Sequence, residues 1–220
     1  MIKTFPVGSQ IDIDHVEKIL SELEPERIPN NNNSSRAAVA LILSEDEECG
    51  TSIFFIKRTE DERDPWSGHM AFPGGRVEKS DADLLDTAIR ETYEETGIDL
   101  KNGKILGMMG EVQSMRPDIK LIITPFVAVA PQNLDDLDIC ENDEVDEVVK
   151  IPISKMKKRS RKVKYGGLYQ QYSTYRYKGY MIWGLTAWIL DQFFSISSLQ
   201  PDNDKRPSNN HTSNLTNRKE

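Results

Sequence analysis

Apolar residues recur along this chain with two different spacings, which predicts a mixture of helices and strands. Over residues 11–24 the spacing is near helical, and Pro25 and Pro29 mark the end of that helix. Residues 37–43 and 52–57 are short apolar runs separated by a polar turn, a pattern typical of a strand hairpin. Further apolar runs predict strands over 104–113, 120–130, 146–153 and 174–183, and a late helix over 185–194.

The clearest helix pattern covers residues 81–96. Leu85 and Ala88 lie on its apolar face, Ser80 can cap its start, and Gly97 can end it. A chain of mostly strands with one strong central helix and a second late helix predicts an α/β sandwich built around a mixed sheet.

Composition divides the chain into three predicted parts. Residues 1–35 hold the first helix and an asparagine-rich flexible loop, and residues 36–198 form the main domain. Residues 199–220 are polar, with a single strong hydrophobe, which predicts a disordered tail.

Charge and composition exclude several classes of protein. The 28 basic and 36 acidic residues give a net charge of −8, whereas a general nucleic-acid binder needs surplus cations. The longest aliphatic run, residues 37–43, is too short to cross a bilayer, and the first residues lack the apolar stretch of a secretory signal. Two cysteines make neither a disulfide framework nor a zinc site. We therefore expect a cytoplasmic globular protein without a structural metal and without nucleic-acid or membrane partners.

Candidate chemistry concentrates on three glutamates of the central helix. Glu91, Glu94 and Glu95 follow the spacing i, i+3, i+4, so their carboxylates share one helix face. Like charges at this spacing repel, and Arg90 cannot neutralise three of them. A divalent cation can, and an oxygen-rich set suits Mg²⁺ or Mn²⁺. The alternative is a solvated helix face; the glycine pair just before the helix favours the metal site.

Residues 74–98 resemble the Nudix box, a motif of one family of hydrolases. Six positions in its second half match residue for residue, namely Arg90, Glu91, Glu94, Glu95, Gly97 and Ile98. There are three departures. Gly75 lies one residue further from Arg90 than in the general pattern, the early Glu position falls on Ala82 beside Asp81, and Thr92 occupies an apolar position.

The longer spacing resembles the coenzyme A pyrophosphatase branch of that family, in which Phe-Pro-Gly-Gly (here 72–75) precedes a lengthened stretch. Upstream, Arg58 and Arg63 match two arginines of the branch, Thr59 stands for its serine, and Gly68 is shifted by one residue. The segment 182–187 also resembles the end of such proteins, so the resemblance covers about residues 36–195.

The resemblance implies a Nudix-type α/β/α sandwich with a central mixed β-sheet, and hydrolysis of a nucleoside diphosphate linked to another group. It implies Glu91 and Glu95 as principal ligands of Mg²⁺ or Mn²⁺, Glu94 as a third, and a carbonyl of Gly75 or Gly74 completing the shell. Arg90 would orient Glu94 through an ion pair. Homodimers are common in the family, although nothing in these residues requires one.

The residues of the reaction are predicted with alternatives. Glu94 or Glu95, acting through a metal-bound water, is the favoured general base, and four loop carboxylates are further candidates. Arg58, Arg63 and Gly74 form the predicted substrate-binding set, since a guanidinium suits an additional phosphate. His69 is expected to support a turn, with a phosphate contact as the alternative. The four loop carboxylates are Glu111, Asp118, Glu141 and Glu144.

Four functions stay open on the sequence alone. The first is cleavage of coenzyme A or its thioesters to 3′,5′-ADP and 4′-phosphopantetheine, and the second is hydrolysis of ADP-ribose or another nucleoside diphosphate sugar. The third is a non-catalytic nucleotide-binding module, and the fourth a nucleoside triphosphatase. The basic run 155–164 is expected to be a solvated loop that pairs with the acidic stretch 135–147, the alternative being a polyanion site.

Overall fold

The computed structural model describes residues 2–4, 10–29, 34–47, 49–61, 67–114, 119–131, 143–165 and 168–197. The predicted loop at residues 30–33 and the predicted tail at 199–220 lie outside the described residues. No helix of the described part is long and apolar enough to span a bilayer.

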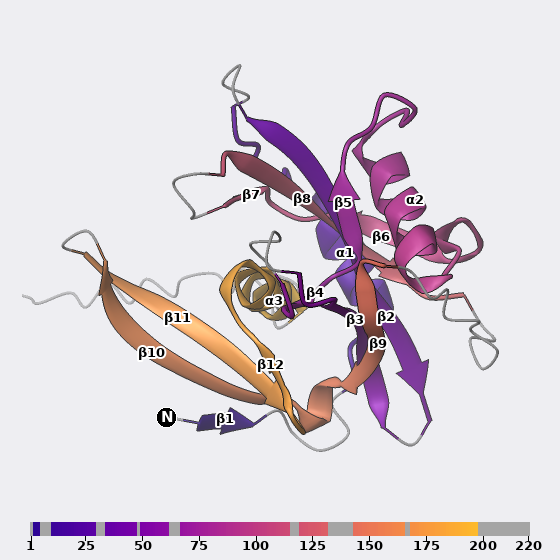
Figure 1. The fold of residues 1–220 in the computed structure, drawn as a ribbon. Coiled ribbons are helices and arrows are strands. Elements are labelled where there is room, and N and C mark those ends of the chain that lie inside the picture. The colour runs from indigo at the N-terminus through magenta and orange to yellow at the C-terminus, as the bar shows by residue number, and fades with distance from the viewer. Residues whose placement is uncertain are drawn as a thin grey trace, which may run out of the picture.

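Within the described residues, two sheets and three helices form the fold (Figure 1). The helices are α1 (Ile13–Glu22), α2 (Leu84–Thr96) and α3 (Gly184–Ser197). The larger sheet contains β2 (Ser35–Asp46), β3 (Gly50–Arg58), β4 (Met70–Ala71), β5 (Gly74–Arg76), β6 (Lys104–Met108), β7 (Val112–Gln113), β8 (Leu121–Val129) and β9 (Val145–Pro152). The smaller sheet contains β1 (Ile2–Thr4), β10 (Lys157–Tyr165), β11 (Leu168–Tyr177) and β12 (Tyr180–Ile182).

The larger sheet is mixed and is covered on both faces. Its β2 runs parallel to β8 and antiparallel to β3 and β5. Because side chains alternate along a strand, β2 serves two cores. One core is shared with α1 and α3 and contains Ala37, Leu41 and Leu43; the other lies towards α2 and contains Ala38, Ala40 and Ile42. This arrangement confirms the predicted α/β/α sandwich with a central mixed sheet (Figure 1).

Element boundaries differ from the predicted ones for local reasons. Helix α2 begins at Leu84, because Asp83, and not Ser80, caps it: an Asp83 carboxylate oxygen accepts from the backbone N–H of Asp86 at 2.9 Å. Gly97 ends the helix in the left-handed conformation, as predicted. The predicted strand 104–113 is broken into β6 and β7, and the predicted strand 174–183 spans the turn of the β11–β12 hairpin.

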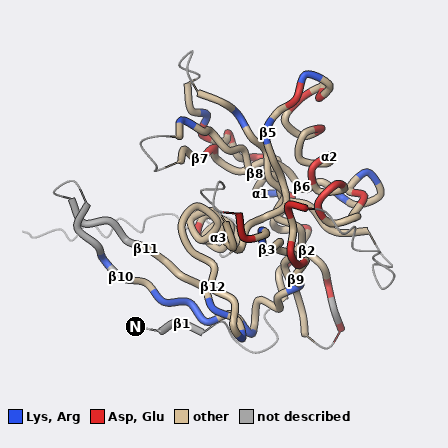
Figure 2. The backbone as a smooth tube through the Cα atoms, viewed as in Figure 1, with Lys and Arg blue, Asp and Glu red and all other residues tan. Residues whose placement is uncertain are grey.

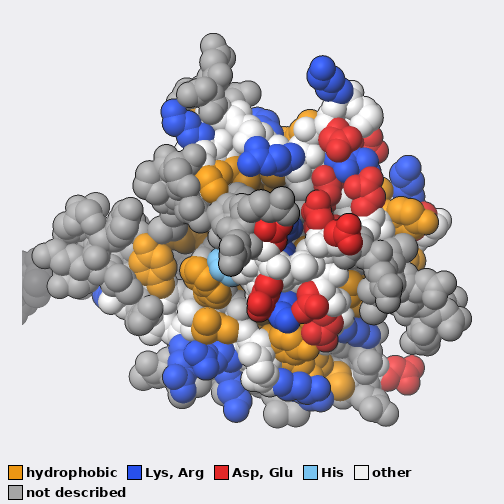
Figure 3. Space-filling view, in the orientation of Figure 1, with side chains coloured by type: hydrophobic (Ala, Val, Ile, Leu, Met, Phe, Trp, Pro, Cys, Tyr) orange, Lys and Arg blue, Asp and Glu red, His pale blue; other side chains and the backbone are white. Residues whose placement is uncertain are grey.

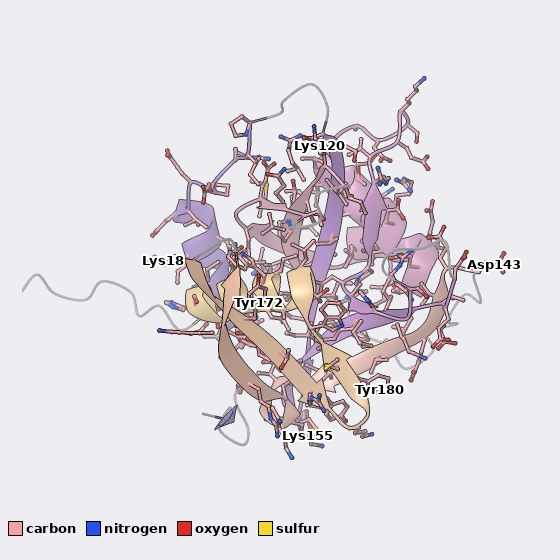
Figure 4. The ribbon with its side chains drawn as sticks, turned by 60° about the vertical axis from the view of Figure 1, so that its left-hand side comes forward. Lys18, Lys120, Asp143, Lys155, Tyr172 and Tyr180 are labelled. Carbon is pink, nitrogen blue, oxygen red and sulfur yellow. The ribbon has the colours of Figure 1, made fainter. Side chains whose placement is uncertain are left out.

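The basic run is a strand, so the predicted solvated loop is wrong. Most of it forms β10, which pairs antiparallel with β11 (Figure 1). Lys158 faces α3, where its ammonium pairs with Asp191, while Lys157 and Arg159 are exposed. Figure 2 shows the cations at the start of β10, and Figure 4 labels Lys155 at that end of the sheet.

Two acids of the stretch 135–147 have partners outside the basic run. Asp146 pairs with Lys57 on β3, and the phenol of Tyr180 donates to Glu147 at 2.7 Å. In Figure 4, Tyr180 lies on the smaller sheet, well apart from Asp143 before β9. The expected pairing between the two charged segments is therefore not seen for these two acids.

A buried carboxylate, Glu111, ties the segment after α1 to the larger sheet. Its side chain is fully buried and accepts hydrogen bonds from four donors. Burial alone would raise the pKa of Glu111, but these donors outweigh it, and the net shift is downward. The donors are the Ile28 backbone N–H (2.7 Å), Arg36 (2.6 Å), Arg27 (3.1 Å) and the Thr124 hydroxyl (3.1 Å). Glu111 is thus committed to structure, which removes it from the candidate bases.

The Glu111→Gln variant is expected to lower the free energy of unfolding by about 2–3 kcal/mol, because it removes the buried charge that pairs with the partly buried Arg36. The depressed pKa means that the Glu111 contribution is present near neutral pH and is lost as the pH falls through that pKa. Urea unfolding at pH 7 and pH 3.5 measures both effects. Glu17→Gln is the control, because its pair with Lys104 is exposed and should contribute below about 0.5 kcal/mol. Equal effects of the two substitutions at pH 7 would contradict this role.

Candidate active site

The three helix glutamates differ in burial, although they share one face of α2. The Glu95 residue is only 4% exposed, because it lies on the same helix side as Ala88 and Thr92, which pack against the sheet. The side chains of Glu91 and Glu94 are 17% and 54% exposed. The set therefore runs from the protein interior to the surface; Figure 2 marks acidic residues along α2, and Figure 3 shows acidic side chains gathered on this face.

The Phe-Pro-Gly-Gly turn between β4 and β5 forms the wall opposite these glutamates. Phe72 is buried and stacks on Phe55 with 5.1 Å between ring centroids, and the Pro73 carbonyl accepts from the Ala40 N–H at 2.9 Å. These contacts hold the next two residues, Gly74 and Gly75, between β2 and α2.

Each glycine of the turn is required for a different reason. A Cβ on Gly74 would lie 2.2 Å from the backbone oxygen of Ala38, and its φ of +145° is one that other residues rarely adopt. A Cβ on Gly75 would lie 2.3 Å from the carboxyl carbon of Glu91. Gly74 thus lets the turn pack on the sheet, and Gly75 leaves the space that the Glu91 carboxylate occupies.

Glu95 is joined to this wall by a hydrogen bond. Its Oε2 accepts from the Gly74 N–H at 2.7 Å, and its Oε1 lies 3.8 Å from the Arg58 guanidinium. The pKa of Glu95 is raised to about 8, mainly by burial; the Gly74 N–H and Arg58 oppose the shift, and the negative charges of Glu91 and Glu144 add to it. Burial also raises the pKa of Glu91. Ionisation of both carboxyls is therefore unfavourable in this site, and a bound cation would favour it.

Arg90 connects the helix to the loop before it. The guanidinium binds Asp81 through two hydrogen bonds, Nε to Oδ1 at 2.8 Å and Nη2 to Oδ2 at 3.0 Å. Its Nη1 lies 3.0 Å from both Glu91 and Glu94. The hydrogen bonds from Arg90 hold the pKa of Asp81 well below its usual range. The ion pair with Glu94 is the one that the sequence analysis assigned to Arg90.

Asp81 is the residue of this site whose role the sequence analysis missed. The Thr87 hydroxyl and the Glu78 N–H also donate to it, both at 2.8 Å, so it closes the loop onto α2. The sequence signal for this role was the position of Asp81 next to Ala82, where the Nudix box has a Glu. With a loop one residue longer, the carboxylate of position 81 reaches Arg90.

The remaining predicted residues lie in different places. Arg58 ends β3 beside Glu95, whereas Arg63 lies outside the described residues, as do Asp118 and Glu141. Glu144 lies just before β9, and its charge contributes to the raised pKa of both Glu91 and Glu95. Among the described loop carboxylates that are candidate bases, Glu144 is the one whose charge affects the pKa values of these two glutamates.

The donor set fits a hard divalent cation. The carboxylate of Glu91 lies beside Gly75 and that of Glu95 beside the Gly74 N–H, and Mg²⁺ and Mn²⁺ favour oxygen ligands. Among the described residues, no three His, Cys, Asp or Glu side chains already surround a common point, and Glu91 and Glu94 are drawn towards Arg90. The burial of two carboxylates with upward-shifted pKa values is the observation that supports the fit.

Comparison with known proteins decides the family. The NUDIX domain model matches residues 34–171, more than half of the chain. This chain belongs to the Nudix family. The uncharacterised Nudix hydrolase NudL of Citrobacter koseri is 33% identical over 142 residues, covering 61% of this chain and 70% of the relative. Its Salmonella typhimurium counterpart is 28% identical over 200 residues, covering 88% of this chain and 98% of the relative.

A solved structure agrees on the fold. The MutT/nudix family protein from Enterococcus faecalis superposes with a TM-score of 0.50 at 16% identity, covering 84% of this chain and 72% of that one. The protein is thus a Nudix hydrolase, a pyrophosphohydrolase of a family that generally needs divalent metal cations.

The two glycines of the turn make a matched pair for mutation. Gly75→Ala is expected to fold and to lower kcat/KM by about 100-fold, because the new methyl group displaces only the flexible end of Glu91. Gly74→Ala meets backbone atoms instead, and is expected to destabilise the fold by about 3 kcal/mol or more. Thermal unfolding and turnover of both variants measure the difference. A Gly75→Ala enzyme with wild-type activity would contradict the proposal that Gly75 leaves the space that the Glu91 carboxylate needs.

Glu95→Gln is expected to abolish turnover and yet stabilise the protein at high pH in the presence of EDTA. The native state retains the Glu95 proton up to about pH 8, so stability falls as the pH rises from the ordinary carboxyl pKa towards 8. Glutamine removes this penalty and keeps an acceptor for the Gly74 N–H. We expect Tm to rise by about 2–5 °C at pH 8.5 and to be unchanged at pH 5.

Glu94→Gln is the control for that measurement, since the Glu94 side chain is half exposed. The difference in Tm between Glu94→Gln and wild type should be the same at pH 5 and pH 8.5. If Glu95→Gln lowered Tm equally at pH 5 and pH 8.5, the burial of an unfavourable charge at this position would be disproved.

Proposed function

We propose that this Nudix hydrolase cleaves the diphosphate of coenzyme A or its thioesters, giving 3′,5′-ADP and 4′-phosphopantetheine or its acylated form. The observation that carries the proposal is the Phe-Pro-Gly-Gly turn, whose glycines accommodate Glu91 and Glu95. The longer loop that follows, closed by Asp81 on Arg90, has the spacing that resembles the coenzyme A branch.

The reaction requires a water molecule to attack phosphorus. A P–O bond forms to the water oxygen, the bond from phosphorus to the bridging oxygen breaks, and the water loses a proton. A bound Mg²⁺ or Mn²⁺ would screen phosphate oxygens and lower the pKa of the attacking water. Glu91 and Glu95 would hold the cation from α2, with Glu94 as a third ligand and the Gly75 or Gly74 carbonyl beside them.

Carboxylates on two sides of the site are candidates to take the proton. Glu94 and Glu95 lie on α2, and Glu144 lies before β9, with its charge felt at both buried glutamates. Arg90 positions Asp81 and Glu94 through hydrogen bonds, and it takes no part in the proposed proton transfer.

Arg58 is the described member of the predicted substrate-binding pair. Its guanidinium is 23% exposed and lies 3.8 Å from Glu95, a distance that favours contact with the diphosphate near the cation. The alternative contact is the 3′-phosphate, as the resemblance suggested for Arg58 and Arg63. The two contacts differ in which substrates lose affinity when Arg58 is removed.

A panel of coenzyme A, dephospho-coenzyme A, ADP-ribose and nucleoside triphosphates, with Mg²⁺ or Mn²⁺ and products identified by mass, tests the proposal. Coenzyme A is expected to give 3′,5′-ADP with the highest kcat/KM. The Arg58→Ala variant is expected to lower kcat/KM by about 10- to 100-fold, because a charge-assisted contact is lost. Equal losses of kcat/KM for coenzyme A and dephospho-coenzyme A would show that Arg58 contacts the diphosphate. A loss for coenzyme A alone would show that Arg58 contacts the 3′-phosphate.

Arg76→Ala is the control, because Arg76 is exposed and its side chain donates to the Ser35 hydroxyl. A higher kcat/KM for ADP-ribose than for coenzyme A would overturn the coenzyme A proposal, while the protein would still be a Nudix hydrolase.

A further inference from the structure

A pair of rings stands at the edge of the site and has no role in the chemistry above. Trp183 follows β12 and is 45% exposed, and its ring lies 4.5 Å from the imidazole of His69, tilted by 60°. A tryptophan that keeps nearly half of its surface in water forgoes much of the stabilisation that burial would give it. Such a residue, held beside a catalytic site, is a candidate contact for a ligand.

The tryptophan is held by anchors on both sides. Ile182 before it is buried and pairs with Tyr175 of β11. Three residues after Trp183, the Thr186 hydroxyl donates to the Met70 carbonyl of β4 at 3.1 Å. The ring is therefore attached to both sheets at a fixed position, and little further ordering is needed when a ligand binds it.

A short chain of contacts leads from this ring pair to the glutamates. The carbonyl of His69 accepts from the Arg58 N–H at 3.0 Å, and the Arg58 guanidinium lies 3.8 Å from Glu95. In Figure 1, β4 lies beside β3, which Arg58 ends, and β12 in turn contacts β4. The rings and the catalytic glutamates are thus separated by one residue at the end of β3.

We infer that the exposed face of Trp183, with His69 behind it, is the stacking surface for the adenine base of the substrate. The inference rests on the proposed function, in which the substrate is an adenosine diphosphate derivative. A flat base offers a π-face that stacks on an aromatic ring whatever its hydrogen-bonding pattern. The pantetheine arm is an aliphatic amide chain and lacks such a face, which favours adenine as the occupant.

The tyrosines of the smaller sheet fit this role less well. Tyr175 is fully buried, and its phenol donates to Asp191 on α3, so it packs the interior. Tyr180 donates to Glu147. In Figure 4, Tyr172 lies on the smaller sheet, far from Asp143, which precedes β9 near the site.

Trp183→Leu in the full chain tests the assignment, with Trp188→Leu as a matched control. Trp188 lies on α3 and is 48% exposed. We expect Trp183→Leu to raise the Kd of 3′,5′-ADP by about 10-fold and the KM of coenzyme A in proportion, with kcat within about 2-fold of wild type. The Kd of 4′-phosphopantetheine should not change. Trp188→Leu should leave all four quantities unchanged.

A conservative substitution keeps the test valid if the leucine variant does not fold. Quenching of tryptophan fluorescence by 3′,5′-ADP should be lost in Trp183→Phe and retained in Trp188→Phe. Unchanged 3′,5′-ADP affinity in Trp183→Leu, a loss confined to 4′-phosphopantetheine, or quenching that survives in Trp183→Phe would each overturn the inference.

The failure of the proposed substrate is distinguishable from the failure of this inference. If wild-type enzyme prefers ADP-ribose, the coenzyme A proposal is wrong. The stacking role is then decided by the Kd of ADP, which Trp183→Leu should still raise by about 10-fold. An unchanged Kd of ADP would contradict it.

Discussion

The site depends on one hydrogen bond, from the backbone N–H of Gly74 to the carboxylate of Glu95. It joins α2 to the turn before β5, and it exists only because Gly74 packs directly on the backbone of β2. The same bond stabilises a carboxylate at a position where an apolar residue would pack more favourably. The upward shift of the Glu95 pKa shows that the bond does not offset the burial of charge. The fold thus retains an electrostatic strain where the family's reaction needs a cation.

Arg90 explains why this strain does not disrupt the helix. The hydrogen bonds from Arg90 to Asp81 turn the guanidinium towards the loop, and it reaches Glu91 and Glu94 from that side. Glu95 has the guanidinium of Arg58 at 3.8 Å instead. Arg90 therefore offsets part of the charge of Glu91 and Glu94, while Glu95 stays in the interior, where burial makes its ionisation unfavourable. A neutralised cluster would have little affinity for a divalent ion.

How much the sequence could predict follows from which contacts are local. The i, i+3, i+4 spacing placed Glu91, Glu94 and Glu95 on one face, and Gly97 ended the helix, because both depend on helix geometry alone. The burial of Glu95 depends on the turn that packs over it, and the anchoring by Asp81 on the length of the loop. Glu111 meets Arg27 and Arg36 across 84 and 75 residues, a proximity that no local pattern reveals.

Strand β10 shows that local composition can also predict the wrong element. Its cations favour a solvated loop by composition, but pairing with β11 and the contact of Lys158 with Asp191 of α3 stabilise an extended strand. That second sheet has a consequence for the site, because β12 ends beside β4 and fixes Trp183 against His69. The NUDIX match ends at residue 171, whereas β12 and α3 lie beyond it. The carboxylates that define the family are thus separate from the segment that we propose contacts the base. In such an arrangement, the choice of substrate can change through β12 and α3 while α2 and its glutamates stay the same.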